Sequence, residues 1–295
     1  MFEPKFRVTA KLLENIKKIS LIVKNLNDRH FSKLTLVKLE KNAREVSSHS
    51  STGIEGNPLQ LTEVKRIIKN RPENIKNSEK EVLNYNSALE ILDKEIKENS
   101  VKFNLSLILK IQKLVTSGLI DQFNSGKLRK QPVFVNDPRT RKPIYLPPDH
   151  QDVQKLVGDL VKFVITNKNR LDPLILAGIF HKQFVIIHPF IDGNGRTARL
   201  LTKILLANMG LNTFNLFSFE NYYNQNVSNY FQNVGVVGNY YGLKDQIDFS
   251  DWLEYFTDGI IDELERVGKI LENEDLSPKT TLKLTALLLM VIMPS

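Results

Sequence analysis

The chain has 295 residues, 41% of them hydrophobic and 25% charged, a composition that suits an ordinary globular protein with a sizeable core. It contains no cysteine, which excludes disulfide bonds and thiolate metal sites. The net charge is +8, but no basic run is interleaved with aromatic residues, so a lysine-rich surface is favoured and nucleic-acid binding is disfavoured.

The first hundred residues are predicted to be largely helical. The N-terminus lacks the uninterrupted apolar stretch of a signal peptide, so we expect a cytoplasmic protein with no membrane anchor. From Lys11 to about Ser100, apolar residues recur three and four positions apart. The clearest examples are Val82, Tyr85, Leu89, Leu92 and Ile96. Turn signals at 53–58 and 71–73 divide this region, and a further helical stretch ends near Gly118.

The character of the sequence changes in segment 129–147. Two short apolar runs, Val133 to Val135 and Ile144 to Leu146, flank a polar turn that contains proline. This arrangement predicts a β-hairpin. Pro132 and Pro143 favour an exposed edge for it, because proline cannot donate a ladder hydrogen bond.

Helical periodicity returns over about 152–269. Asp172 and Pro173 are typical of a helix start, and this helix is expected to run to about Ile187. A second helix is expected after the next glycines, closed by Gly210. The predicted fold class is therefore mainly α, with one small hairpin.

The loop 188–195 between these two helices has the features of an anion site. Gly193 and Gly195 allow the backbone to turn its N–H groups inward, at a helix N-terminus that adds partial positive charge. Arg196 and Arg199 are three residues apart, so they are expected to share one helix face and to hold phosphate oxygens.

Two further side chains supply chemistry. Asp192 offers a hard carboxylate oxygen of the kind that Mg²⁺ takes alongside phosphate oxygens and water. His188 can accept a proton near neutral pH. Taken singly, such residues are more often structural, but their combination between His188 and Arg199 predicts nucleotidyl or phosphoryl transfer. His181, seven residues earlier, is interpreted as a packing or orienting residue.

The segment HPFIDGNGRTAR resembles the signature of the Fic family, HPFx[DE]GNGRxxR, with every fixed position present. GKLRKQPVFV, IYLPPDHQDVQKLVGDLVKFV and DFSDWLEYFTDGI resemble the approach to the family's flap, the segment after it and the closing helix. The resemblance implies a Fic-type helical core at 101–265 with one β-hairpin flap. An N-terminal helical region at 1–100 and a C-terminal helical tail at 266–295 would flank this core. The apolar run 286–293 in the tail is too short to span a bilayer and indicates a short buried helix or a truncated end.

The resemblance implies transfer of AMP from ATP, the co-substrate, to a target hydroxyl. His188 would deprotonate the hydroxyl, and Asp192 would hold the cofactor Mg²⁺ against the α- and β-phosphates. The remaining implied nucleotide ligands are the anion-hole residues Gly193, Asn194 and Gly195 and the β- and γ-phosphate ligands Arg196 and Arg199. The flap residues Val133, Phe134 and Val135 would pair with an extended target segment by strand addition.

The segment 51–56, STGIEG, resembles the motif [ST]xxxE[GN] of the N-terminally inhibited class of the family, with Ser51 and Glu55 at fixed positions. We expect Glu55 to pair with Arg199 and compete with ATP, the alternative being a solvated Glu55 after a helix end. The implied partners are target proteins with accessible Ser, Thr or Tyr hydroxyls, with self-modification and a homodimer also expected. Residues in the region of the adenine pocket, among which spacing does not choose, are Tyr222, Tyr223, Tyr230 and Asn233.

Other functions are compatible with the same residues. A Fic-type enzyme could transfer phosphocholine, UMP or phosphate, or remove AMP under the control of Glu55. A DNA-linked regulator belongs to a different class, which the positive charge allows, although no recognition helix can be named. A P-loop NTPase is disfavoured, because the sequence has no GxxxxGK[ST].

Overall fold

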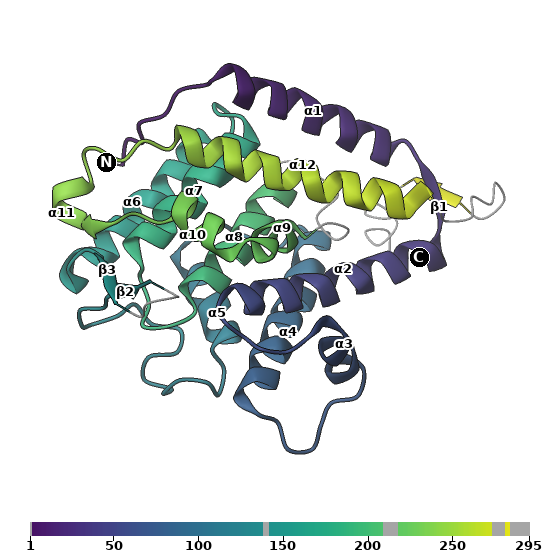
Figure 1. Ribbon diagram of the computed structural model, residues 1–295, viewed down its shortest axis with the longest axis horizontal. Coiled ribbons are helices and arrows are strands. Elements are labelled where there is room, and N and C mark those ends of the chain that lie inside the picture. The colour runs from purple at the N-terminus through teal and green to yellow at the C-terminus, as the bar shows by residue number, and fades with distance from the viewer. Residues whose placement is uncertain (1, 138–141, 209–217, 273–280, 284–295) are drawn as a thin grey trace.

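The protein is built mainly from helices, which confirms the predicted fold class (Figure 1). The computed structural model describes residues 2–137, 142–208, 218–272 and 281–283. Its helices are α1 (Ala10–Asn27), α2 (Lys33–Ile54), α3 (Leu61–Lys69), α4 (Asn77–Lys97), α5 (Leu105–Val115), α6 (His150–Asn167), α7 (Pro173–Ile187), α8 (Asn194–Asn208), α9 (Phe219–Gln225), α10 (Val227–Val234), α11 (Tyr240–Leu243) and α12 (Ser250–Glu272). Its strands are β1 (His30–Ser32), β2 (Val135–Asn136), β3 (Pro143–Leu146), β4 (Gly238–Asn239) and β5 (Thr281–Lys283).

Helix α7 forms the centre of the fold because it is apolar on nearly every side. All residues from Leu174 to Ile187 are buried except Val185, and a helix of this kind must be enclosed by others. Helices α6, α8 and α12 pack around it. It begins as predicted: the Asp172 carboxylate accepts from the Leu174 N–H at 2.8 Å, and Pro173 occupies the first turn.

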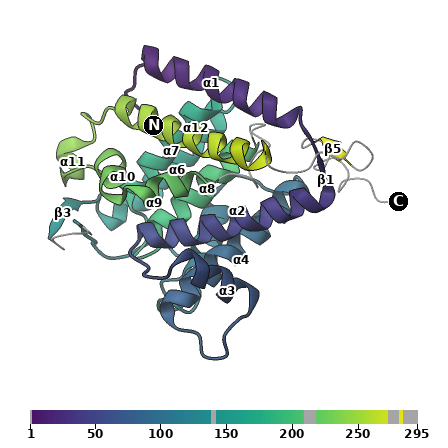
Figure 2. The ribbon, with the colours of Figure 1, turned by 45° about the vertical axis from the view of Figure 1, so that its right-hand side comes forward.

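The start of the chain lies along the last long helix. Two views show α1 and α12 side by side (Figure 1, Figure 2). The Asn15 amide donates to the Thr257 hydroxyl at 3.0 Å and to the Asp258 carboxylate at 2.8 Å across this contact. Buried side chains of both α1 and α12 belong to the same hydrophobic core. The domain boundaries at residues 100 and 265 stay predictions.

Helix α2 has an unusual buried surface in its last two turns. Five hydroxyl side chains there are at most 2% exposed, and we call them the hydroxyl face: Ser47, Ser48, Ser50, Ser51 and Thr52. Helix α2 packs against α4 and α9. It ends at Ile54, and Gly56 just beyond it has a φ of +91°, which a residue with a side chain rarely adopts. The turn predicted at 53–58 is therefore present.

The predicted hairpin is part of a larger sheet. Strand β3 pairs with β2 in antiparallel fashion, with Val135 opposite Tyr145, and also with β4 in parallel, with Tyr145 opposite Gly238. Of the two hairpin strands, β2 is therefore at the edge of the sheet and β3 is at its centre. The third strand, β4, was not predicted.

The first flap strand is also shifted from its predicted position. It covers Val135–Asn136, so Val133 and Phe134 precede it. Continued pairing in the same register would set Val133 opposite Pro147, which has no N–H to donate. Pro143 is tolerated because it is the first residue of β3.

The start of α8 and the pairing of β1 with β5 also differ from what the sequence predicts. Helix α8 begins at Asn194, between the glycines rather than after them. Strands β1 and β5 pair antiparallel, which was not predicted. The expected helix end at Gly210 and the apolar run 286–293 lie outside the described residues.

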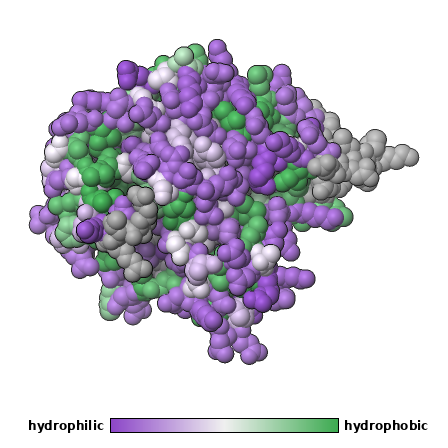
Figure 3. Space-filling view, in the orientation of Figure 1, coloured by the Kyte–Doolittle hydropathy of each residue, from purple (hydrophilic) through white to green (hydrophobic). Residues whose placement is uncertain are grey.

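Hydrophilic residues cover most of the face in Figure 3, and hydrophobic residues gather near α10, α11 and the small sheet. Val237 and Phe134, from these parts of the chain, are 73% and 59% exposed. Among the residues that the structure describes, no helix is both long and apolar enough to cross a membrane.

We predict opposite effects of alanine at two helical glycines. A Cβ on Gly178 of α7 would lie 2.6 Å from Leu253 Cδ2 and 3.1 Å from Phe256 Cδ1, whereas a Cβ on Gly158 of α6 would meet nothing within 4 Å. Gly158→Ala should raise the free energy of unfolding by about 0.5–1 kcal/mol, because alanine favours the helix. Gly178→Ala should lower it by about 1–3 kcal/mol, because the core around it is already filled.

Urea unfolding followed by circular dichroism measures both changes. Equal stabilisation by the two substitutions would contradict close packing of α7 against α12.

Candidate active site

A tight loop joins α7 to α8 and carries the candidate catalytic residues. The side-chain oxygen of Asn194 accepts from the Phe190 N–H at 2.9 Å, and its side-chain nitrogen donates to the Phe190 carbonyl at 2.9 Å. Phe190 has no exposed surface, so it anchors the loop in the core. Asn194 thus closes the loop with its side chain and begins α8 with its backbone.

His188 ends α7 in a left-handed conformation, with φ 50° and ψ 59°. This conformation is uncommon for a residue with a side chain and is often found at functional sites. Its Nδ1 lies 3.2 Å from the Val185 carbonyl oxygen. Because a carbonyl can only accept, Nδ1 carries the proton and Nε2 is left as an acceptor. Burial lowers the pKa of His188, so the imidazole is neutral at neutral pH and ready to take a proton.

Two glycines shape the backbone at the start of α8. Gly193 has a φ of +79°, and a Cβ on it would lie 2.8 Å from Thr116 Cγ2. A Cβ on Gly195 would lie 2.1 Å from Glu55 Oε1. The Glu55 carboxylate therefore rests directly against the first turn of α8, where a helix favours negative charge.

Arg199 is buried and faces the end of α2. Its Nε donates to the Ser51 hydroxyl at 2.8 Å, and its Nη2 donates to the Ser51 carbonyl at 2.9 Å and to Glu55 Oε1 at 2.7 Å. Burial alone would lower the pKa of Arg199, but the Glu55 carboxylate outweighs it and the pKa is raised. Arg199 Nη1 is also buried and has no hydrogen-bond partner among the described residues.

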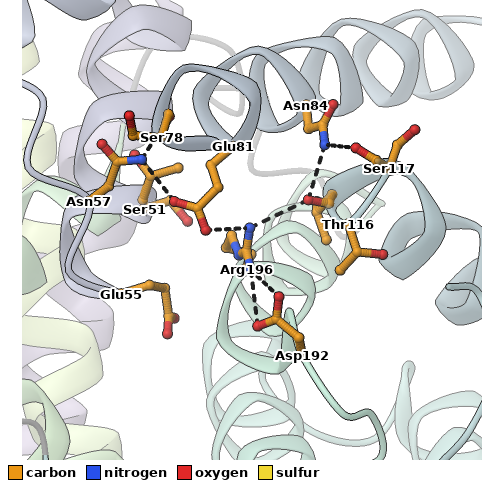
Figure 4. Close-up of polar contacts among 12 residues, drawn as sticks. Ser51, Glu55, Asn57, Ser78, Glu81, Asn84, Thr116, Ser117, Asp192 and Arg196 are labelled. Carbon is orange, nitrogen blue, oxygen red and sulfur yellow. Dashed lines mark hydrogen bonds and ion pairs between the residues drawn. The ribbon is translucent and has the colours of Figure 1, made fainter. Parts of the chain in front are cut away.

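Arg196 lies between Asp192 and Glu81 (Figure 4). Its Nη2 lies 3.1 and 3.0 Å from the two Asp192 oxygens, and its Nη1 lies 3.0 Å from Glu81 Oε1 on α4. The second Glu81 oxygen accepts from the Asn57 amide at 2.8 Å. Arg196 and Arg199 therefore bond different carboxylates, and the prediction that both hold phosphate oxygens stays a prediction.

A cavity of about 330 Å³ opens beside this loop. Its lining includes His188, Gly195, Arg199 and Glu55. Residues of α10 and of the segment 234–237 that follows it also line it. Asp192, Gly193, Asn194 and Arg196 do not. The cavity is thus lined by three of the seven residues predicted to act between His188 and Arg199.

Of the four residues predicted near an adenine pocket, only Tyr230 lines the cavity. Tyr223 is buried and stacks on Tyr230, with ring centroids 4.7 Å apart. Tyr222 packs against Tyr223 on the side of α12, away from the cavity. The Asn233 amide donates to the Asn229 carbonyl at 2.8 Å. Of these four residues Tyr230 is therefore the one that lines the cavity, and the adenine pocket stays a prediction.

The flap contributes one side of the cavity. Val135, Ile144 and Tyr145 line it. Val133 and Phe134 do not, and Phe134 projects into solvent instead. Of Val133, Phe134 and Val135, the residues expected to pair with a target, only Val135 lines the cavity.

Residues 102–206 match the family model described as the Fic/DOC family. This segment of the chain is a Fic domain. The protein adenylyltransferase Fic of Aedes aegypti is 27% identical over 220 residues, which are 68% of this chain and 42% of that relative. The protein of the same name from Nematostella vectensis is 30% identical over 166 residues, 55% of this chain and 37% of that relative. The chain thus spans about two fifths of the length of these curated relatives.

Solved structures show the same fold. A Fic family protein from Desulfovibrio desulfuricans G20 has a TM-score of 0.75 at 21% identity, covering 93% of this chain and 79% of that one. A Fic domain containing signaling protein from Bacteroides thetaiotaomicron has a TM-score of 0.71 at 21% identity, covering 90% and 99%. These likenesses establish a Fic fold for this chain.

Sequence reasoning missed two side chains that support the Fic loop. Gln112 Nε2 donates to the Asp192 carbonyl at 3.1 Å. Gln112 is a polar residue on the buried face of α5, between Ile111 and Val115, and this was a usable signal. Arg129 donates to the His188 carbonyl at 2.8 Å. Nothing in its basic surroundings separated it from solvated neighbours.

His181 orients the cavity wall of the Fic domain, as its interpretation as an orienting residue suggested. Its two ring nitrogens lie 3.0 Å from the Thr202 hydroxyl and 3.0 Å from the Tyr230 hydroxyl. Burial, and then the charge of Arg199, lowers the pKa of His181 to about 3. The ring therefore stays neutral across the ordinary pH range.

We predict that this neutral histidine makes the protein sensitive to acid. Below about pH 6.5 the unfolded chain binds a proton at His181 that the folded protein refuses until about pH 3, so stability falls as pH falls. Between pH 7.5 and 5 the loss is about 2 kcal/mol. His181→Gln removes this proton uptake, so its free energy of unfolding should fall less than that of the wild type over the same range.

Denaturant titrations at the two pH values provide the measurement. The interpretation is wrong if both proteins lose the same stability.

Proposed function

We propose that the protein transfers AMP from ATP to hydroxyl side chains of target proteins. The observation that carries this proposal concerns Arg199, which is among the residues that line the cavity and whose buried Nη1 has no hydrogen-bond partner among the described residues. A buried guanidinium N–H without an acceptor favours an anion, and phosphate fits its fork. The cavity size and apolar walls suit a nucleotide. The names of the similar adenylyltransferases support the same reaction.

The chemistry follows from His188 and the start of α8. Nε2 of His188 takes the proton of the target hydroxyl, whose oxygen attacks the α-phosphorus of ATP. The bond from the α-phosphorus to its bridging oxygen breaks, and pyrophosphate leaves with that oxygen. The backbone N–H groups of Gly193, Asn194 and Gly195 stabilise the charge on the phosphates, together with Arg196 and Arg199.

Mg²⁺ is the metal that fits these residues. Among the described residues no group of three or more His, Asp or Glu side chains could hold a metal ion. Mg²⁺ needs no such cage, because it commonly binds through one or two carboxylates, phosphate oxygens and water. Asp192, with 45% of its side chain exposed, would supply the carboxylate. The bound ion would neutralise charge on the phosphates.

Glu55 is proposed to inhibit the reaction. Its carboxylate bonds Arg199 and rests against Gly195, so it occupies the position that a phosphate would take. Arg199 has no exposed side-chain surface and Glu55 has 30%, so the pair is shielded from water far more than a surface ion pair. ATP must therefore displace Glu55 to reach the guanidinium. Ser51 holds the same guanidinium from α2.

The target is proposed to bind at the flap edge. Strand β2 is a free edge among the described residues, so an extended target segment can add to it by main-chain hydrogen bonds. The partners are then proteins with accessible Ser, Thr or Tyr hydroxyls, including a second copy of this chain in self-modification. A homodimer and a cytoplasmic location remain proposals.

We predict that His188→Ala abolishes AMP transfer and leaves Mg·ATP binding largely intact, because only the proton acceptor is lost. The rate should fall by about 10²–10⁴-fold. Transfer of label from α-labelled ATP to proteins of a cell lysate gives the rate, and calorimetry gives ATP binding. A rate within a few-fold of the wild type would show that His188 is not the base.

We predict that Glu55→Gly raises transfer and self-modification at saturating Mg·ATP. Each 1.4 kcal/mol of competition removed is worth about a factor of ten. The matched control is Glu73→Gly, which removes an exposed carboxylate in the loop between α3 and α4. Equal rates for the wild type, Glu55→Gly and Glu73→Gly would refute inhibition by Glu55. If a group other than AMP is transferred, or if AMP is removed from proteins, the protein carries out one of the alternative reactions and not the proposed one.

A further inference from the structure

Arg129 lies buried between the two ends of the flap and the catalytic loop. It is 3% exposed. Its Nη1 donates to the Gln131 carbonyl before β2, and its Nη2 donates to the Pro148 carbonyl after β3. Its Nε donates to the His188 carbonyl at 2.8 Å, and its backbone N–H to the Pro189 carbonyl at 3.0 Å. The Arg129 side chain thus donates hydrogen bonds to both ends of the flap and to the backbone of His188.

The contact to His188 falls where a helix needs outside partners. The last carbonyls of a helix have no donor within the helix. At the end of α7, the Tyr145 hydroxyl donates to the Ile186 carbonyl at 3.0 Å, and Arg129 serves the His188 carbonyl. Both donors belong to the flap region. The left-handed backbone of His188 is therefore held from the flap side.

We propose that Arg129 is a positioning residue that sets the target-binding flap in register with His188. A target segment added to β2 then presents its hydroxyl at a fixed distance from the imidazole. This inference rests on the proposed function and extends it to the coupling between target capture and proton transfer. Rigid alignment of this kind matters because small misplacements of reacting groups cost large factors in rate.

The guanidinium suits this role better than an ammonium group. All three of its side-chain nitrogens donate to carbonyl oxygens in different directions. Lysine keeps the positive charge but concentrates its donors on one atom. Arg129→Lys therefore separates the geometry of the fork from its charge. Arg266→Lys is the matched control, because it makes the same substitution at a partly buried arginine of α12 that bonds Glu263 and does not line the cavity.

The first test compares these variants in the Glu55→Gly background. Label transfer from α-labelled ATP to lysate proteins should fall about 100-fold in Arg129→Lys, while the Mg·ATP dissociation constant measured by calorimetry stays unchanged. Arg266→Lys should retain most of the transfer. Should both variants lose transfer in proportion to their loss of thermal stability, Arg129 is a structural residue and the inference is wrong. Arg129→Gln, a neutral side chain of similar length, replaces Arg129→Lys if that variant does not fold.

The second test does not depend on activity. The imidazole C–H signal of His188, identified in NMR spectra by its loss in His188→Gln, should move in Arg129→Lys and stay in place in Arg266→Lys. An unmoved signal in Arg129→Lys overturns the inference. If the Glu55→Gly protein with Arg129 intact transfers no AMP, the proposed function has failed, and the NMR comparison still decides the positioning role.

Discussion

The guanidinium of Arg199 has no surface in contact with solvent, and a cation in such a place must have negative charge or aligned acceptors beside it. Ser51 and Glu55 supply them from the end of α2. The position of α2 on the rest of the protein is thus tied to one side chain of α8. Arg199 and His188 both line the cavity, so an anion that enters meets an arginine that already bonds Ser51 and Glu55.

The second arginine of the loop is neutralised by a separate set of carboxylates. Arg196 bonds Asp192 and Glu81, and Glu81 in turn accepts from Asn57, two residues beyond Glu55. One short turn after α2 therefore reaches both arginines, directly at Arg199 and through Glu81 at Arg196. Both arginines thus have carboxylate partners within the protein, and in the reaction proposed above a phosphate chain would displace them.

Local signals in the sequence predicted the parts of the site that depend on neighbours along the chain. The start and end of α7 followed from Asp172, Pro173 and an apolar pattern. The loop 188–195, which contains two glycines, followed from its composition. Contacts between distant segments left no such trace. Strand β4 is two residues long and includes a glycine, and its pairing with β3 depends only on tertiary placement. The directions of Arg196 and Arg199 were likewise decided by carboxylates on α4 and beyond α2, far away in the sequence.

The cavity wall was predicted only in part for a related reason. Spacing on α9 and α10 could not distinguish a tyrosine that faces the cavity from one that packs behind it. Tyr230 faces it because His181 bonds its hydroxyl, whereas Tyr223 fills the layer beneath. Arg129 is the strongest case. A buried arginine that bonds backbone carbonyls has no sequence pattern of its own, since its partners are peptide groups that every residue carries.

The hydroxyl face of α2 has a thermodynamic consequence. From Ser47 to Gly56, Ile54 is the one large apolar side chain that is buried. Water can replace the partners of hydroxyl groups, and exposing polar surface lowers the heat capacity where apolar surface raises it. Detachment of this segment would therefore carry a small heat-capacity change, unlike unfolding of the core around α7. The enthalpy of such a detachment should then change little with temperature.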